Sequence, residues 1–246
     1  MADLNVKKIV ITQSNYIPWK GYFDAIALAD EFVIYDDMQF TKRDWRNRNV
    51  IKTPQGPKWL TIPVDVKGKY FQKIRDTRIS EPTWNKDHWN MIVQNYSKAP
   101  HFKEVKDFLE DLYMKATQTF LTEVNVYFLE KICSFLEIPF RFRMSGEFEL
   151  HEDRTQRLVN IVKELDGTEY YSGPAAKAYM ELNRFEEKQI DVHYFDYSGY
   201  PEYRQLNPPF DHGVSIVDLL LNEGGASAEF LKYTLKSNGQ HFRTGQ

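Results

Sequence analysis

Residues 8–37 read KIVITQSNYIPWKGYFDAIALADEFVIYDD and place two short apolar runs on either side of one helical segment. The first run, residues 8–12, has the length and the β-branched side chains of a strand. Residues 32–37 repeat that pattern and end in two aspartates, while residues 22–31 carry apolar side chains at helical spacing. A strand, a helix and a strand within about 30 residues predict a right-handed βαβ unit with parallel strands.

The rest of the chain predicts a larger α/β domain around this unit. Residues 50–64 are typical of a β-hairpin that turns at residues 54–56, and residues 84–138 carry the periodicity of three helices. An amphipathic helix is expected at 152–167. We expect one domain over residues 1–246, with a mostly parallel sheet, flanking helices, a β-hairpin after the second strand and a helical insertion at about 84–138. The further strands are expected at 139–145, 169–172 and 190–197.

Composition excludes several classes of protein. The net charge of −3 argues against non-specific nucleic-acid binding, which needs a basic surface. The single cysteine, Cys133, excludes an internal disulfide and a zinc-thiolate cluster. None of the 6 histidines falls in a metal-binding pair, so no metal site is expected. No apolar stretch has the length of a signal peptide core or of a membrane span, so we expect a soluble, cytoplasmic protein.

Polar and aromatic loops follow the predicted strands. Ligands of open parallel sheets bind beyond the carboxyl ends of the strands, where loops lead into helices. Because parallel strands end at the same edge of a sheet, these loops should gather on one rim and form a site. The loops are residues 12–23, 35–49, 143–157 and 170–179.

The first loop is rich in large side chains for a connection between a strand and a helix. It either covers the edge of the sheet or forms a rigid aromatic pocket, in which Pro18 fixes one backbone angle and Gly21 allows a close approach. The second interpretation makes its aromatic and polar side chains substrate-binding candidates. These candidates are Gln13, Asn15, Tyr16, Trp19, Lys20 and Tyr22.

Two carboxylates and one histidine are the candidate catalytic residues. Asp36 and Asp37 end the second predicted strand, and adjacent strand residues point to opposite faces, so one of them should face the site. That carboxylate could act as a general base or help to hold Mg²⁺, although a helix cap or a solvated turn is the plain alternative. His212 is the reserve candidate for the base.

Basic side chains on the same rim suggest anion recognition. The stretch 42–48 is either a solvated basic face or a site for phosphate or carboxylate, which suit the fork of arginine. At the last loop, Ser172, Gly173 and Lys177 could bind an anion at a helix N-terminus, or could be an ordinary cap. Arg154 and Arg157 add positive charge. The binding candidates of the basic stretch are Lys42, Arg43, Trp45, Arg46, Asn47 and Arg48.

No hydrolase elbow, P-loop or dinucleotide fingerprint occurs in the chain. Instead, QSNYIPWKGYFDAIALADEFVIYDDMQFTKRDWRNRNVIKTPQGPKWLTIPV (13–64) resembles the opening of the WbqC-like family. YYSGPAAKAYM (170–180), YPEYRQ (200–205) and VSIVDLLLNEG (214–224) resemble its C-terminal blocks. The usual form of the first motif is QPNYLPW, and we expect Ser14, which replaces the proline, to compensate by hydrogen bonding.

This resemblance implies a role in O-antigen or other polysaccharide biosynthesis. The activity suggested for the family is transfer of glycine, or a related aminoacyl group, to the amino group of a nucleotide-linked deoxyamino sugar. The donor would be activated by ATP, by a carrier protein or as a charged tRNA, and no other nucleic-acid partner is expected. Asp37 or Asp36 would be the base, backbone N–H groups near Gly21 or Gly173 would stabilise the oxyanion, and the basic side chains would hold the diphosphate.

A second resemblance keeps two alternatives open. The strand, aromatic turn and helix at the start of the chain are similar to nucleotidylyltransferase-like α/β domains, but the two histidines of their H-x-G-H turn are absent here. The alternatives are therefore a nucleotidyltransferase-like enzyme that uses ATP, and a non-catalytic module that binds nucleotide-sugars or a glycosyltransferase.

Overall fold

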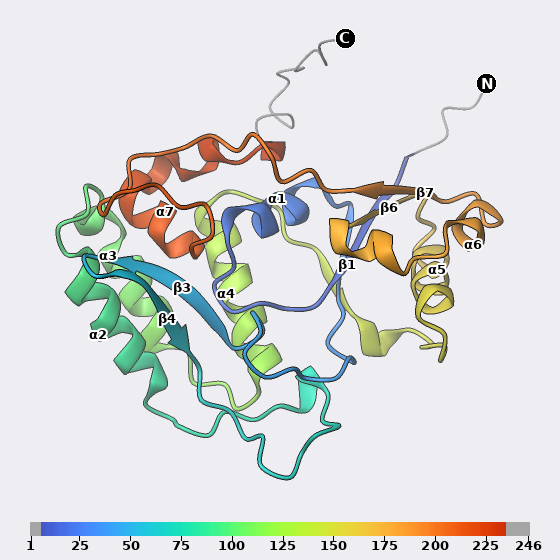
Figure 1. The fold of residues 1–246 in the computed structure, drawn as a ribbon, viewed down its shortest axis with the longest axis horizontal. Helices are drawn as coiled ribbons and strands as arrows, with labels where there is room; N and C mark the ends of the chain where they lie inside the picture. Colours follow the sequence, from blue (N-terminus) through green and yellow to red (C-terminus); the bar gives the residue numbers. More distant parts are fainter. Residues whose placement is uncertain (1–5, 235–246) are drawn as a thin grey trace.

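The computed structural model describes residues 6–234, and its centre is a five-stranded sheet in the order β5-β2-β1-β6-β7 (Figure 1). All neighbouring strands in it are parallel. The chain moves outward from β1 to β2 and β5, and then returns to the other side of β1 to form β6 and β7. The strands are β1 (Lys8–Thr12), β2 (Glu31–Ile34), β5 (Phe142–Met144), β6 (Glu169–Ser172) and β7 (Asp191–Tyr194).

The two faces of the sheet are covered by different helices, as Figure 1 shows. Side chains of β1 alternate between the faces: Val10 belongs to one buried apolar cluster, and Ile9 and Ile11 belong to the other. Helices α5 (Arg154–Glu164) and α6 (Leu182–Glu186) pack on the side of Ile9. The opposite side carries α1 (Lys20–Leu28), which connects β1 to β2.

The helical insertion and the β-hairpin lie on the side of α1. The insertion consists of α2 (Trp84–Tyr96), α3 (Phe102–Met114) and α4 (Leu121–Phe135). The hairpin pairs β3 (Arg48–Thr53) with β4 (Gly56–Thr61), and it packs between α2 and α7 (Ile216–Glu223). The expected α/β class, the parallel sheet, the hairpin and the insertion are therefore confirmed.

Several of the expected elements are shorter than the sequence pattern indicated. The strands expected at 32–37 and 139–145 are only Glu31–Ile34 and Phe142–Met144. The strand expected at 190–197 ends at Tyr194, where the chain leaves the edge of the sheet. The segment after Gly173 forms only a five-residue 3-10 helix, Pro174–Ala178, and not the start of an α-helix. Within residues 6–234, no helix has the length and apolarity that crossing a membrane would require.

A buried carboxylate joins the loops to the insertion. Asp36 is 1% exposed and accepts hydrogen bonds from the Ser14 backbone N–H (2.8 Å) and from the hydroxyls of Ser14 and Thr122 (2.6 Å each). Asn125 of α4 donates to Ser14 Oγ and to the carbonyl of Arg46, both at 2.9 Å. Burial raises the pKa of Asp36, and the hydrogen bonds from Ser14 and Thr122 oppose that rise. The hydrogen bonding expected of Ser14 is thus present.

A second buried polar group connects the first loop to α2 and α3. The Tyr16 hydroxyl lies 2.8 Å from His88 Nδ1 and 3.0 Å from the Tyr113 hydroxyl. His88 Nε2 lies 3.2 Å from the carbonyl of Thr61, which can only accept, so Nε2 carries the proton and Nδ1 accepts from Tyr16. Burial lowers the pKa of His88 to about 4, so the ring is neutral at pH 7.

Replacing Thr122 by valine tests the Asp36 network. The substitution keeps the shape of the side chain but removes one hydrogen bond to a buried carboxylate, so we expect a loss of about 2 kcal/mol of unfolding free energy in urea. The control is Thr117→Val at an exposed position, with an expected change within about 0.5 kcal/mol. Equal stability of the two variants would contradict a structural role for this bond.

The lowered pKa of His88 predicts that the protein loses stability in acid. Its pKa in the folded state lies below its ordinary value of 6.5, so the unfolded chain binds the proton more tightly. The contribution of the neutral His88 ring to the free energy of unfolding is complete above pH 6.5. It falls as the pH drops through the folded-state pKa of about 4, by about 3 kcal/mol in total. Urea unfolding at several pH values should show a weaker pH dependence for His88→Gln than for the wild type.

Candidate functional site

A cavity of about 670 Å³ lies at the carboxyl edge of the sheet, and we call it the rim cavity. It lies beyond the ends of β1 and β6, which are neighbours whose connections leave the sheet in opposite directions. This switch point is where doubly wound sheets bind their ligands. All the loops that we expected to gather contribute to its lining. They place there Gln13, Tyr35, Arg46, Arg154, Ser172 and Gly173.

Three arginines give the rim cavity its charge. Arg46 has a side chain that is 14% exposed, donates from Nη1 to Asn15 Oδ1 and keeps a buried Nε without a hydrogen bond. Arg157 is held by the carbonyl of His151 (2.5 Å) and by the Tyr35 hydroxyl (3.2 Å). Arg154 is exposed, and its side chain makes no ion pair or hydrogen bond with another described residue. Arginine forks so placed suit a phosphate or a carboxylate.

The candidate catalytic aspartates do not line this cavity. Asp36 is enclosed by Ser14 and Thr122, as described above. Both aspartates lie in a turn after β2 and not in the strand, so the alternation of strand side chains does not apply to them. The Asp37 side chain is 4% exposed and lies 2.9 Å from Lys73 Nζ and 2.8 Å from Arg75 Nη1. Ser145 also donates to it, at 2.8 Å. Both carboxylates thus have structural partners that a substrate would have to displace.

Glu152 is the carboxylate that lines the rim cavity among the described residues. It is exposed and lies in the loop that precedes α5. The sequence interpretation singled out the arginines of this loop and missed Glu152. The position of Glu152 between β5 and α5, on a loop already expected at the rim, is the signal that could have identified it.

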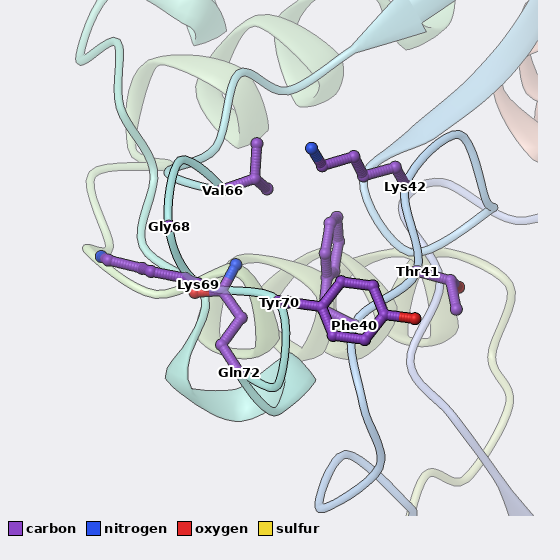
Figure 2. A pocket seen from close by; sticks show the side chains of 8 residues that line it. All are labelled: Phe40, Thr41, Lys42, Val66, Gly68, Lys69, Tyr70 and Gln72. Carbon is purple, nitrogen blue, oxygen red and sulfur yellow. The ribbon is translucent and has the colours of Figure 1, made fainter.

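The basic stretch 42–48 divides between separate places. Arg46 reaches the rim cavity, whereas Lys42 lines another pocket, of about 620 Å³, together with Phe40 and Tyr70. Figure 2 shows the Lys42 side chain extending over that pocket towards Val66. The basic side chains of residues 42–48 therefore contribute to two separate pockets and do not form a single anion-binding site.

The other members of the stretch have local structural partners. Arg48 stacks on Trp59, with its guanidinium carbon 4.0 Å from the ring centre, and donates to the carbonyl of Arg43. Asn47 donates to the carbonyl of Ile62 at 2.8 Å. Arg43 is exposed and has a positive φ of 61°. None of the three lines the rim cavity.

The first loop is also divided, because its aromatic rings point in different directions. Tyr16 is 0% exposed and belongs to the core, and Tyr22 is 7% exposed and donates to the carbonyl of Gln13 at 2.9 Å. Asn15 and Trp19 instead line a cavity of about 370 Å³, which we call the aromatic pocket. Its other lining residues are Pro18, Trp45, Asn49, Tyr197, His212 and Gly213.

Gly21 is required beside Trp19. A Cβ atom at Gly21 would lie 2.2 Å from the Trp19 ring, so the missing side chain allows the ring to cover the start of α1. Gly21 itself lines neither cavity. Gly173 does line the rim cavity, but it caps only the short 3-10 helix, which is too short for the helix-terminal anion site that we had expected.

Lys20 and Lys177 lie outside the rim cavity. Lys20 is 4% exposed, donates to the carbonyl of Pro201 at 2.6 Å and lies 5.3 Å from the ring centres of Tyr200 and Tyr203. Burial lowers the pKa of Lys20 to about 8. Lys177 lies 5.0 Å above the ring of Tyr194.

His212 lies at the aromatic pocket, apart from both aspartates. Burial, together with the positive charge of Lys20, lowers the pKa of His212 below its ordinary value. Its Nδ1 atom is buried and has no hydrogen-bond partner. In the part of the chain that the structure describes, no three His, Cys, Asp or Glu side chains gather as metal ligands.

Comparison with known proteins supports the sequence resemblance. The model of the WbqC-like protein family matches residues 13–230. Over 228 residues the chain is 50% identical to the uncharacterized protein Rv1507c of Mycobacterium tuberculosis, which covers 93% of this chain and 99% of that protein. No solved structure gives a significant match.

Replacing Gly21 by alanine tests the position of Trp19. The new Cβ would overlap the ring, so the ring must move, and we expect a loss of about 1–3 kcal/mol and a shift in tryptophan fluorescence. Gly173→Ala is the matched control, because its nearest contact would be the Tyr197 hydroxyl at an ordinary 3.8 Å. If Gly21→Ala leaves stability and fluorescence unchanged, the ring does not lie over Gly21.

Proposed function

The chain belongs to the WbqC-like protein family, and we propose that it is an acyltransferase. It would move glycine, or a related aminoacyl group, onto the amino group of a nucleotide-linked deoxyamino sugar. The choice of this reaction comes from the family resemblance. The observation that carries the substrate class is the rim cavity, which presents three arginines at the switch point of a parallel sheet.

The rim cavity suits a sugar that carries a diphosphate. Its volume of about 670 Å³ lies in the range of small-molecule sites. The Arg154 guanidinium, which has no partner among the described residues, is free for a bidentate bond to phosphate. Arg46 and Arg157 add positive charge, although protein acceptors take part of their N–H groups. Since the whole chain has a net charge of −3, the attraction for an anion is confined to such local sites. Gln13 supplies polar groups for sugar hydroxyls.

Acyl transfer to an amine needs a base and donors for an oxyanion. The sugar ammonium must lose a proton before its nitrogen attacks, and we assign that proton to Glu152, the carboxylate at the cavity. The N–C bond then forms as the bond between the acyl carbon and its leaving group breaks, and the leaving group takes the second proton. The Ser172 hydroxyl and the Gly173 backbone are our candidates for the oxyanion donors.

The acyl donor must arrive activated, because a free carboxylate is a poor electrophile. An aminoacyl adenylate made from ATP, a thioester on a carrier protein and an ester on tRNA all meet this requirement. The reaction would take place in the cytoplasm, within O-antigen or other polysaccharide assembly.

Mass spectrometry of a nucleotide-linked deoxyamino sugar tests the proposal. The sugar is incubated with the protein and with glycine plus ATP, glycyl thioester or glycyl-tRNA in separate reactions, and a glycyl adduct is the expected product. Arg154→Ala and Glu152→Gln should each reduce the rate at least ten-fold. Their matched controls are Arg204→Ala and Glu149→Gln, at exposed positions outside the cavity. The absence of an adduct with every donor would overturn the proposal.

Two alternatives give different outcomes in the same reactions. Counted along the chain, the sheet strands lie in the order 3-2-1-4-5, which is shared with nucleotide-binding doubly wound sheets. A nucleotidyltransferase-like enzyme would therefore release pyrophosphate from ATP without a glycyl adduct. A binding module, favoured by the structural partners of Asp36 and Asp37, would be stabilised by the nucleotide-sugar and would form no product.

A further inference from the structure

The aromatic pocket is a second cavity that the proposed acyl transfer does not use. Its walls are the rings of Trp19, Trp45 and Tyr197. The Trp19 and Tyr197 rings meet edge to face, with centres 5.1 Å apart. The Trp45 ring is supported by Trp59 at 5.2 Å, yet Trp45 remains 43% exposed. Each of these rings has an apolar face, and a planar ligand could stack on one of them.

Two polar side chains that line the same pocket have hydrogen-bonding atoms without a partner among the described residues. Asn15 accepts from Arg46 through Oδ1, and its Nδ2 group makes no hydrogen bond with another described residue. His212 has a buried Nδ1 without a partner, and burial lowers the pKa of the ring, which favours the neutral form with one donor and one acceptor. An acyl chain would leave these groups unmatched, whereas the edge of a heterocyclic base offers both donors and acceptors.

The aromatic pocket is next to the rim cavity. Arg46 lines the rim cavity and bonds Asn15, which lines the aromatic pocket. On the other side, the Tyr197 hydroxyl would lie 3.8 Å from a Cβ atom at Gly173, a residue of the rim cavity. Side chains alone therefore separate an aromatic site from a cationic one.

We infer that the aromatic pocket binds the base of a nucleotide whose phosphates contact Arg46. The inference rests on the proposed function only in taking this nucleotide to be the one that carries the sugar. The base would lie against Trp45 and Trp19, its edge would meet Asn15 and His212, and the sugar to be modified would occupy the rim cavity.

Quenching of tryptophan fluorescence tests the inference without any acyl transfer. The probes are the diphosphates of thymidine, uridine, guanosine and adenosine, with pyrophosphate as the probe that lacks a base. At least one nucleoside diphosphate should bind ten-fold or more tightly than pyrophosphate, because stacking of a base adds to phosphate binding. Calorimetry of the same probes supplies affinities that do not depend on fluorescence.

Trp45→Ala should lower the affinity for the preferred nucleoside diphosphate at least ten-fold and leave the affinity for pyrophosphate unchanged. Because Trp45 is 43% exposed and lies outside the buried core, the variant should fold. His212→Ala, at the edge of the pocket, should also lower the affinity for the nucleoside diphosphate but not the affinity for pyrophosphate. Phe71→Ala is the matched control, since Phe71 is 84% exposed and lines neither cavity.

Equal binding of nucleotides and pyrophosphate to the wild-type protein would overturn the inference, as would an unchanged nucleotide affinity in Trp45→Ala. Failure of the proposed function is a separate result. If nucleotides bind as expected and no donor gives a glycyl adduct, the base site stands and acyl transfer is wrong. If the adduct forms and Trp45→Ala keeps full nucleotide affinity, acyl transfer stands and the base site is wrong.

Discussion

The buried carboxylate of Asp36 is the group on which the arrangement of the loops depends. A charge so far from water must be matched by hydrogen-bond donors, and here these come from the first loop, through Ser14, and from α4, through Thr122. Asn125 extends the same network to the backbone of Arg46. The end of β2, the first loop, the basic stretch and the insertion are therefore fixed relative to one another. Part of the wall of each cavity, including Asn15 and Arg46, comes from segments that this network holds.

Much of the fold could be predicted from the sequence, because it depends on local periodicity and on a general rule of connection. The strands at 8–12 and 169–172 agree with their β-branched and aromatic patterns, and three helices occur where helical spacing predicted them. The gathering of loops at one rim followed from parallel strands alone. The strand after residue 190 was too long in the prediction, since nothing in its sequence shows where an edge strand loses its partner.

The site was harder to predict, because a sequence pattern does not say where a side chain points. Tyr16 and Trp19 are three residues apart in one loop, but the positive φ of Ile17 (36°) turns the chain between them, and one ring enters the core while the other lines a pocket. Asp36 and Asp37 looked equally suited to catalysis, and tertiary partners on α4 and around residues 73–75 occupy both. Among the basic side chains, Arg48 does not reach the rim cavity because it stacks on Trp59.

The bond between Arg46 and Asn15 has a consequence for how a ligand enters. A single neutral-to-charged hydrogen bond contributes only about 1.5–3 kcal/mol. A phosphate competes for the same guanidinium and would offer it a stronger partner than an amide oxygen. An arriving anion would therefore weaken the hydrogen bond between Arg46 and Asn15, which lies between the two cavities. The two cavities would then join only around a ligand with a negative charge.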